Sequence, residues 1–322
     1  MRAFAFFLLT MSASAAVTIE KTDFKGWANS YRISNGEVEL IVTSDVGPRI
    51  IRFAFVGGQN IFKEFAAEIG KSGESKWLSR GGHRLWVGPE VAENLSPITY
   101  AIDNGPVKID VRGDTLVATP AFEKEVGLQK QIEVRLAPSG TNVEVIHRVT
   151  NQNPWAIELA AWCLSVMAPG GVGITGLPPR GTHPEMLAPS NPLTIWAFTH
   201  LDDPRWKFLK KYILLRQDPA NAVPQKIGHF NPDTWGAYYL NNELFIKRYA
   251  ADATKTYPDL GASYETFTNA EMLELETMGP LTKLRPGDTV IHVERWSLYR
   301  NIKLEKMDEP ELDRVVAPLV SR

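Results

Sequence analysis

Two carboxylates, Glu274 and Glu276, lie two positions apart in segment 271–280 and could together perform acid–base chemistry. Alternate residues of a β-strand share a face, so both side chains would point to one side of a sheet, opposite Leu273 and Leu275. If that face is buried, repulsion raises the pKa of one carboxyl into the range that a general acid or base needs. If the face is solvated, the two glutamates are an ordinary polar surface. The pattern alone leaves both interpretations open.

A second segment, 80–90, places charged and aromatic side chains around a short apolar strand, with two glycines that permit close backbone approach. An indole can stack on the C–H face of a pyranose, and charged groups can bind its hydroxyls. This mixture is suited to sugar binding, although a strand with polar residues facing solvent would have the same composition. The residues concerned are Arg80, His83, Arg84, Trp86 and Glu90.

The elements that would position these residues are strands. Helical periodicity is nearly absent, whereas period-two patterns recur between turn residues such as Asn35-Gly36. We predict a mostly β chain of roughly fifteen to twenty strands, built as two large antiparallel sheets packed face to face. The expected strands include 37–42, 129–136, 142–150, 238–240, 244–249 and 289–298, and the expected helices are 64–69 and 309–319.

The organisation of the chain follows from its length and its first residues. A single positive charge, a short apolar run and small residues near position 16 are typical of a signal peptide over 1–16. The remainder, 17–322, contains no linker or repeat and is predicted to form one domain. The glycine- and proline-rich stretch 169–192 is expected to be a long surface loop at the rim of a binding groove. The protein is therefore expected to be exported, to the periplasm or the medium.

Composition argues against several functional classes. The 35 Lys and Arg residues and 37 Asp and Glu residues give a net charge of −2, which does not favour nucleic-acid binding. The single cysteine, Cys163, excludes an intramolecular disulfide. No later segment approaches transmembrane length, so no membrane association is expected after signal cleavage. The six histidines lie far apart in sequence, and we predict no metal and no cofactor.

At segment 271–280 the chain resembles galactose mutarotase-like proteins, including the aldose 1-epimerases. Residues 275–278, Leu-Glu-Thr-Met, are similar to the Leu-Glu-Thr-Gln stretch that holds the catalytic carboxylate of that family, and Leu-Arg-Pro-Gly at 284–287 follows as in the family. Residues 80–85 are similar to a sugar-lining Arg-Gly-Gly stretch, and 35–40 with 45–50 resemble the opening hairpin. The resemblance extends over most of 17–322.

This resemblance implies an all-β galactose mutarotase-like supersandwich with a sugar in a groove and interconversion of sugar anomers. It implies that Glu276 is the general base that takes the proton from the anomeric hydroxyl. The chain departs from the family at the general acid, because Trp162 stands where a histidine is expected and no histidine occurs between His147 and His183. We therefore name His83 as the candidate acid.

Three functions remain open from the sequence. The first is an aldose 1-epimerase-like isomerase, the second a carbohydrate-binding protein without turnover, and the third a domain related to polysaccharide lyases or hydrolases. The ligand would be a mono- or oligosaccharide, and several arginines would suit an acidic one. The predicted substrate-binding residues are Arg49, Arg80, Arg84, Trp86, Glu90, Trp162, Trp235 and Glu274.

Overall fold

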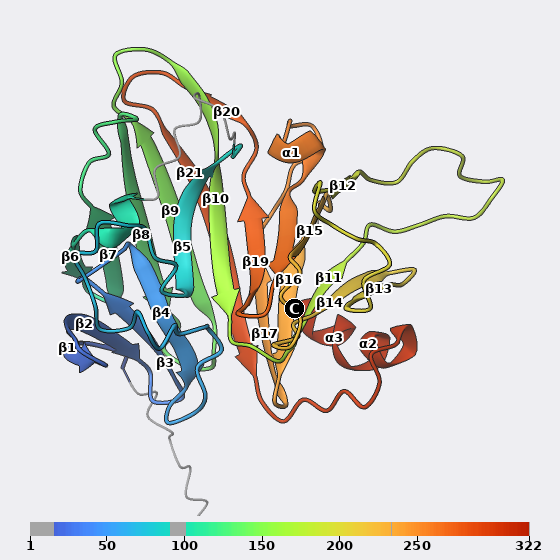
Figure 1. Cartoon of the computed structure of the whole chain (residues 1–322), viewed down its shortest axis with the longest axis horizontal. Helices are drawn as coiled ribbons and strands as arrows, with labels where there is room; N and C mark the ends of the chain where they lie inside the picture. The colour runs from blue at the N-terminus through green and yellow to red at the C-terminus, as the bar shows by residue number, and fades with distance from the viewer. Residues whose placement is uncertain (1–15, 91–100, 233, 322) are drawn as a thin grey trace, which may run out of the picture.

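The computed structural model describes residues 16–90, 101–232 and 234–321, in which two large antiparallel sheets pack face to face (Figure 1). The fold class predicted from the alternating patterns is thereby confirmed. Across the eleven-stranded sheet the order is β1 (Thr18–Phe24), β2 (Trp27–Ser34), β3 (Val38–Thr43), β4 (Arg49–Phe55), β5 (Gly82–Gly88), β10 (Ile157–Met167), β19 (Leu273–Met278), β18 (Tyr264–Thr268), β15 (Gln225–His229) and β12 (Leu193–Ile195), with β20 (Thr282–Leu284) paired to β10.

The second sheet has ten strands and covers one face of the first. Its order is β13 (Trp206–Phe208), β14 (Tyr212–Arg216), β11 (Val172–Gly176), β16 (Trp235–Leu240), β17 (Glu243–Arg248), β21 (Thr289–Tyr299), β9 (Val143–Asn151), β8 (Leu128–Leu136), β7 (Thr115–Pro120) and β6 (Val107–Arg112). The short helices are α1 (Pro258–Gly261), α2 (Glu309–Val315) and α3 (Ala317–Val320), with a 3-10 turn at Ala101–Asn104.

The core lies between the sheets, because apolar side chains alternate on their facing sides. In β8 and β9 every second residue is buried, as the period-two sequence pattern predicts. Hairpins form at the predicted turns. Asn241 and Asn242, between β16 and β17, both adopt the left-handed conformation with φ of 48° and 63°, which asparagine tolerates better than most residues.

Two sequence predictions about local structure are wrong. Segment 64–69 is not a helix: Glu64 forms an isolated bridge with Gly81, and turns follow, while Ile69 packs against the buried cluster around Trp27. Stretch 169–192 is not all loop, because β11 occupies part of it and is buried within the ten-stranded sheet. The remaining 177–192 is mostly exposed and projects from the body between β11 and β12 (Figure 1).

The structure tests the prediction made for the C-terminal end of the chain but not the one made for its N-terminal end. The C-terminal helical prediction is confirmed by α2 and α3, with Asp308 capping the first through a bond from the Glu311 backbone N–H. The predicted signal lies outside the described residues except for its last position. Among the helices of the described ranges, none is long and apolar enough to cross a membrane.

Candidate functional site

The middle of the eleven-stranded sheet carries a row of chemically active side chains on the face turned away from the other sheet. The registers of β5, β10, β19, β18 and β15 align Arg84, Leu164, Glu276, Glu265 and Gly228 across the sheet. Glu274 occupies the same face as Glu276, two residues away, as the alternation predicts. We call this surface the outer face.

Glu276 is fully buried and held by two donors. Its Oε2 accepts bonds from Lys226 Nζ at 2.9 Å and from Trp162 Nε1 at 2.8 Å. Lys226 Nζ also lies 2.8 Å from Glu265 Oε2, so one ammonium group joins two carboxylates. Among the described residues, Glu276 Oε1 has no hydrogen-bond partner. One buried acceptor oxygen at the centre of the site, Glu276 Oε1, therefore lacks a hydrogen-bond donor among the described residues.

Glu274 forms the second carboxylate of the outer face. Its Oε1 lies 2.9 Å from Arg84 Nη2. Burial raises the pKa of Glu274 to about 7, the charge of Glu276 adds to this rise, and Arg84 opposes it. The sequence left open whether Glu274 and Glu276 lie on a buried or a solvated face. In the structure both side chains are buried.

Indole rings form a wall beside these carboxylates. Trp86 and Trp162 meet edge to face with ring centroids 5.4 Å apart, and both are buried. The Arg84 guanidinium lies 4.2 Å from the centroid of the Trp86 ring, and Lys226 Nζ lies 4.7 Å from that of Trp196. Cations stacked on indoles next to carboxylates give a surface with both apolar and polar groups.

The predicted arginines gather at one end of the outer face, but each already has an acidic partner. Arg49 is fully buried, and burial lowers its pKa to about 10, with the charge of Asp103 opposing the effect. The interaction partners of Arg49, Arg80 and Arg84 are Asp103, Glu74 and Glu274, respectively. These pairs leave little positive charge for an acidic ligand.

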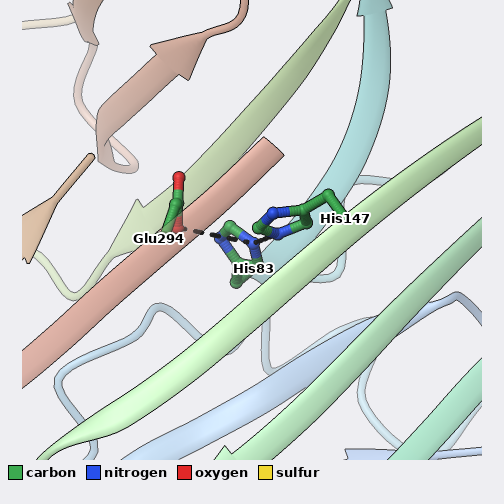
Figure 2. Close-up of side chains that lie close together, drawn as sticks. All are labelled: His83, His147 and Glu294. Atoms are coloured by element: carbon green, nitrogen blue, oxygen red, sulfur yellow. Dashed lines mark hydrogen bonds and ion pairs between the residues drawn. The ribbon is translucent and has the colours of Figure 1, made fainter. Parts of the chain in front are cut away.

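His83 does not lie with Glu276, which corrects its prediction as the general acid. It neighbours Arg84 in β5, so strand alternation turns it to the inner face, where it is fully buried. Its Nδ1 lies 2.9 Å from Ser165 Oγ. Its Nε2 lies 2.7 Å from His147 Nε2, a contact drawn in Figure 2. The sheet itself therefore separates His83 from any ligand on the outer face.

The inner cluster has the composition of a metal site, which the sequence did not predict. His83, His147 and Glu294 bring one ligand atom each within 4.8 Å of the others (Figure 2). Lys247 Nζ, however, lies 2.8 Å from Glu294 Oε1, and Trp296 Nε1 donates to Oε2 at 2.7 Å. Because protein donors already satisfy this carboxylate, we assign no metal to the cluster.

Of two further predicted residues, one lies outside the site and the other lies at its rim. Trp235 is in β16 of the other sheet and packs with Tyr212 against the C-terminal helices, so it is not part of the outer face. Glu90 follows β5, is exposed, and raises the pKa of the nearby Asp259 carboxyl through its charge. Glu90 thus belongs to the rim of the site.

Sequence reasoning missed Glu265, Asp259 and Trp196. Glu265 faces Glu276 across β18 and β19, and Asp259 interacts with Glu265 from the turn that precedes β18. Apolar and polar residues do not alternate around Glu265 at 264–268, so the local sequence gives no clear signal for its role. The pairing of distant strands, which brings it to Glu276, cannot be read from the sequence.

The fold is that of the galactose mutarotase-like β-sandwich proteins. Similar solved structures include a candidate aldose 1-epimerase from Klebsiella pneumoniae, with a TM-score of 0.59, 11% identity, and coverage of 95% of this chain and 87% of that one. A galactose mutarotase-like protein from Lactobacillus casei ATCC 334 has a TM-score of 0.53 at 10% identity, over 84% of this chain and 100% of that chain. No protein-family profile and no curated protein matches the sequence. The likeness therefore concerns the fold.

Proposed function

We propose that the protein binds a carbohydrate on the outer face, at Glu276. The observation that carries the proposal is the unpartnered Glu276 Oε1, which lies beside the indole of Trp162 and the ammonium of Lys226. A buried acceptor without a donor is unfavourable, and a sugar hydroxyl would satisfy it. The neighbouring indoles offer a surface for the C–H face of the ring.

Interconversion of anomers at the same site is a second candidate, favoured by the Glu274 carboxyl, whose pKa is about 7. Glu276 would take the proton of the anomeric hydroxyl while Glu274 protonates the ring oxygen as the C1–O5 bond breaks. Rotation about the C1–C2 bond and reversal of these steps would close the ring as the other anomer. Trp162 cannot be the acid, because an indole N–H donates a hydrogen bond without releasing its proton.

Glu276→Gln is expected to weaken sugar binding by about 10- to 100-fold, because a charge-assisted hydrogen bond contributes about 1.5–3 kcal/mol. Isothermal titration calorimetry with glucose, galactose and their amino and acidic derivatives measures the affinity. Saturation-transfer NMR measures exchange between anomers. If Glu276 is the base, the catalysed exchange should fall by about 10²- to 10⁴-fold.

Glu271→Gln is the matched control, because Glu271 precedes the same strand and is exposed. It should leave both affinity and exchange unchanged. Unaltered exchange in a folded Glu276→Gln variant would remove Glu276 from catalysis and leave a binding protein. Absence of binding to every sugar tested would overturn the proposal itself.

We also propose that the protein acts outside the cytoplasm, on the basis of the signal-peptide pattern over 1–16. Mass spectrometry of the protein from periplasmic or extracellular fractions should give a mature N-terminus near Ala16 or Val17. An uncleaved chain confined to the cytoplasm would contradict this.

A further inference from the structure

Among the described residues, several acidic side chains gather around Lys226 at one end of the outer face. Lys226 is the cation that acts on both Glu265 and Asp259, and Glu276 acts on both as a negative charge. Burial raises the pKa of Glu265 well above its usual range; Lys226 opposes the rise, and Glu276 and Asp259 increase it. A single ammonium group, that of Lys226, thus serves the carboxyl groups of both Glu265 and Glu276.

The buried part of this cluster lacks donors. Glu265 is 1% exposed and Glu276 is fully buried, and no N–H or hydroxyl donor of the described residues bonds to Oε1 of either. Lys226 approaches only the Oε2 atoms of the two. Buried carboxylate oxygens are normally hydrogen-bonded, so a ligand that brings donors would stabilise them.

Asp259, which interacts with Glu265, is only partly buried. Asp259 and Leu260 both have left-handed φ values, 50° and 61°, although neither is glycine. Such a conformation costs about 1–3 kcal/mol per residue. This turn holds the Asp259 carboxyl against Glu265, whose side chain hydrogen-bonds to it.

An aromatic ring completes the cluster. A side chain at Gly228 would lie 3.4 Å from the Trp196 ring and 3.2 Å from the Glu265 side chain, so the glycine lets the indole lie close to the carboxylate. Trp196 already stacks with the Lys226 ammonium and is partly exposed. Carboxylates beside an indole are suited to recognising a substituted ammonium group.

We infer that the ligand is an amino sugar, whose protonated amine binds Glu265 and Asp259 while its ring lies against the indoles of the outer face. This inference rests on the proposed carbohydrate function and specifies the substrate class. It replaces the acidic sugar expected from the sequence. The arginines on which that expectation rested are paired with carboxylates, whereas the acidic cluster would repel a second carboxylate.

Calorimetric titration at pH 6.5 with glucosamine, galactosamine and mannosamine, each compared with its N-acetyl derivative and its parent hexose, tests the inference. The amine form of at least one sugar should bind 10-fold or more tightly than its neutral counterparts. Glu265→Gln should abolish that preference, so that the variant binds the amine and its neutral counterparts equally. Glu158→Gln, at an exposed position of β10, should change neither affinity.

The outcomes separate this inference from the function on which it rests. Equal binding of amine and neutral sugars would overturn the inference and leave the carbohydrate function standing. No binding of any sugar would overturn both. Titration with CaCl₂ alone is the remaining arm: Glu265-dependent calcium binding without a preference for amines would assign the cluster to a metal ion and overturn the inference.

Discussion

Lys226→Met is expected to destabilise the protein by about 3–5 kcal/mol at neutral pH, because removing one partner leaves buried carboxylates uncompensated. Lys226 joins Glu276 and Glu265 through contacts of 2.9 and 2.8 Å, and its side chain is 9% exposed. Methionine retains the length and apolar stem of lysine. The lost free energy of unfolding therefore measures the contribution of the ammonium group. Urea unfolding at pH 7 measures it, and sugar binding should be lost as well.

The destabilisation caused by Lys226→Met should be smaller when the side chains of Glu265 and Glu276 are already neutral. In the triple variant Lys226→Met, Glu265→Gln, Glu276→Gln, neither of the two buried carboxylates that Lys226 joins remains charged, and most of the stability should return. Lys283→Met, at an exposed position of β20, is the control and should be neutral. If Lys226→Met alone were as stable as the unaltered protein, Glu265 and Glu276 would have to be hydrated or protonated at pH 7, and the charged, closed site described above would be wrong.

Strand alternation accounts for both a success and a failure of the sequence analysis. Applied to Glu274 and Glu276, it correctly places both on one face of β19. The same rule places His83 and Arg84 on opposite faces of β5. The prediction of His83 as the general acid rests instead on the many charged and aromatic side chains of segment 80–90. A histidine adjacent in sequence to a site arginine on a strand cannot point into the same groove.

Long-range pairing limits what the sequence can establish about the site. Trp162 was placed there by family resemblance, and it does donate to Glu276. Trp235 has the same residue type and a similar local pattern, yet it belongs to the other sheet. The position of Glu265 depends on the register between β18 and β19, which no local signal specifies. Local patterns therefore predict the strands, and the sheet order decides which side chains meet.

The pH dependence of stability should carry opposite signs for a buried histidine and for a buried carboxyl. Burial lowers the pKa of His229 to about 4, so its neutral form is favoured in the folded protein. This contribution is present above the unfolded pKa of about 6.5 and is lost as pH falls towards 4. Relative to His229→Gln, the unaltered protein should lose about 3 kcal/mol over that interval.

The Glu274 carboxyl should make the stability of the protein depend on pH with the opposite sign. Burial and Glu276 raise its pKa to about 7, against the opposing effects of Arg84 and Lys226. Its protonated form is favoured by folding, so its contribution is present below pH 4.5 and is lost as pH rises through 7. Relative to Glu274→Gln, the unaltered protein should gain about 3 kcal/mol between pH 7 and 4.5. Urea unfolding of each pair across pH 4–8 measures both differences, and His200→Gln, at an exposed position, should show neither. Slopes of the same sign for the two variants would mean that a neighbouring charge, and not burial, dominates one of the two shifts, because a charge moves the pKa of an acid and of a base in the same direction.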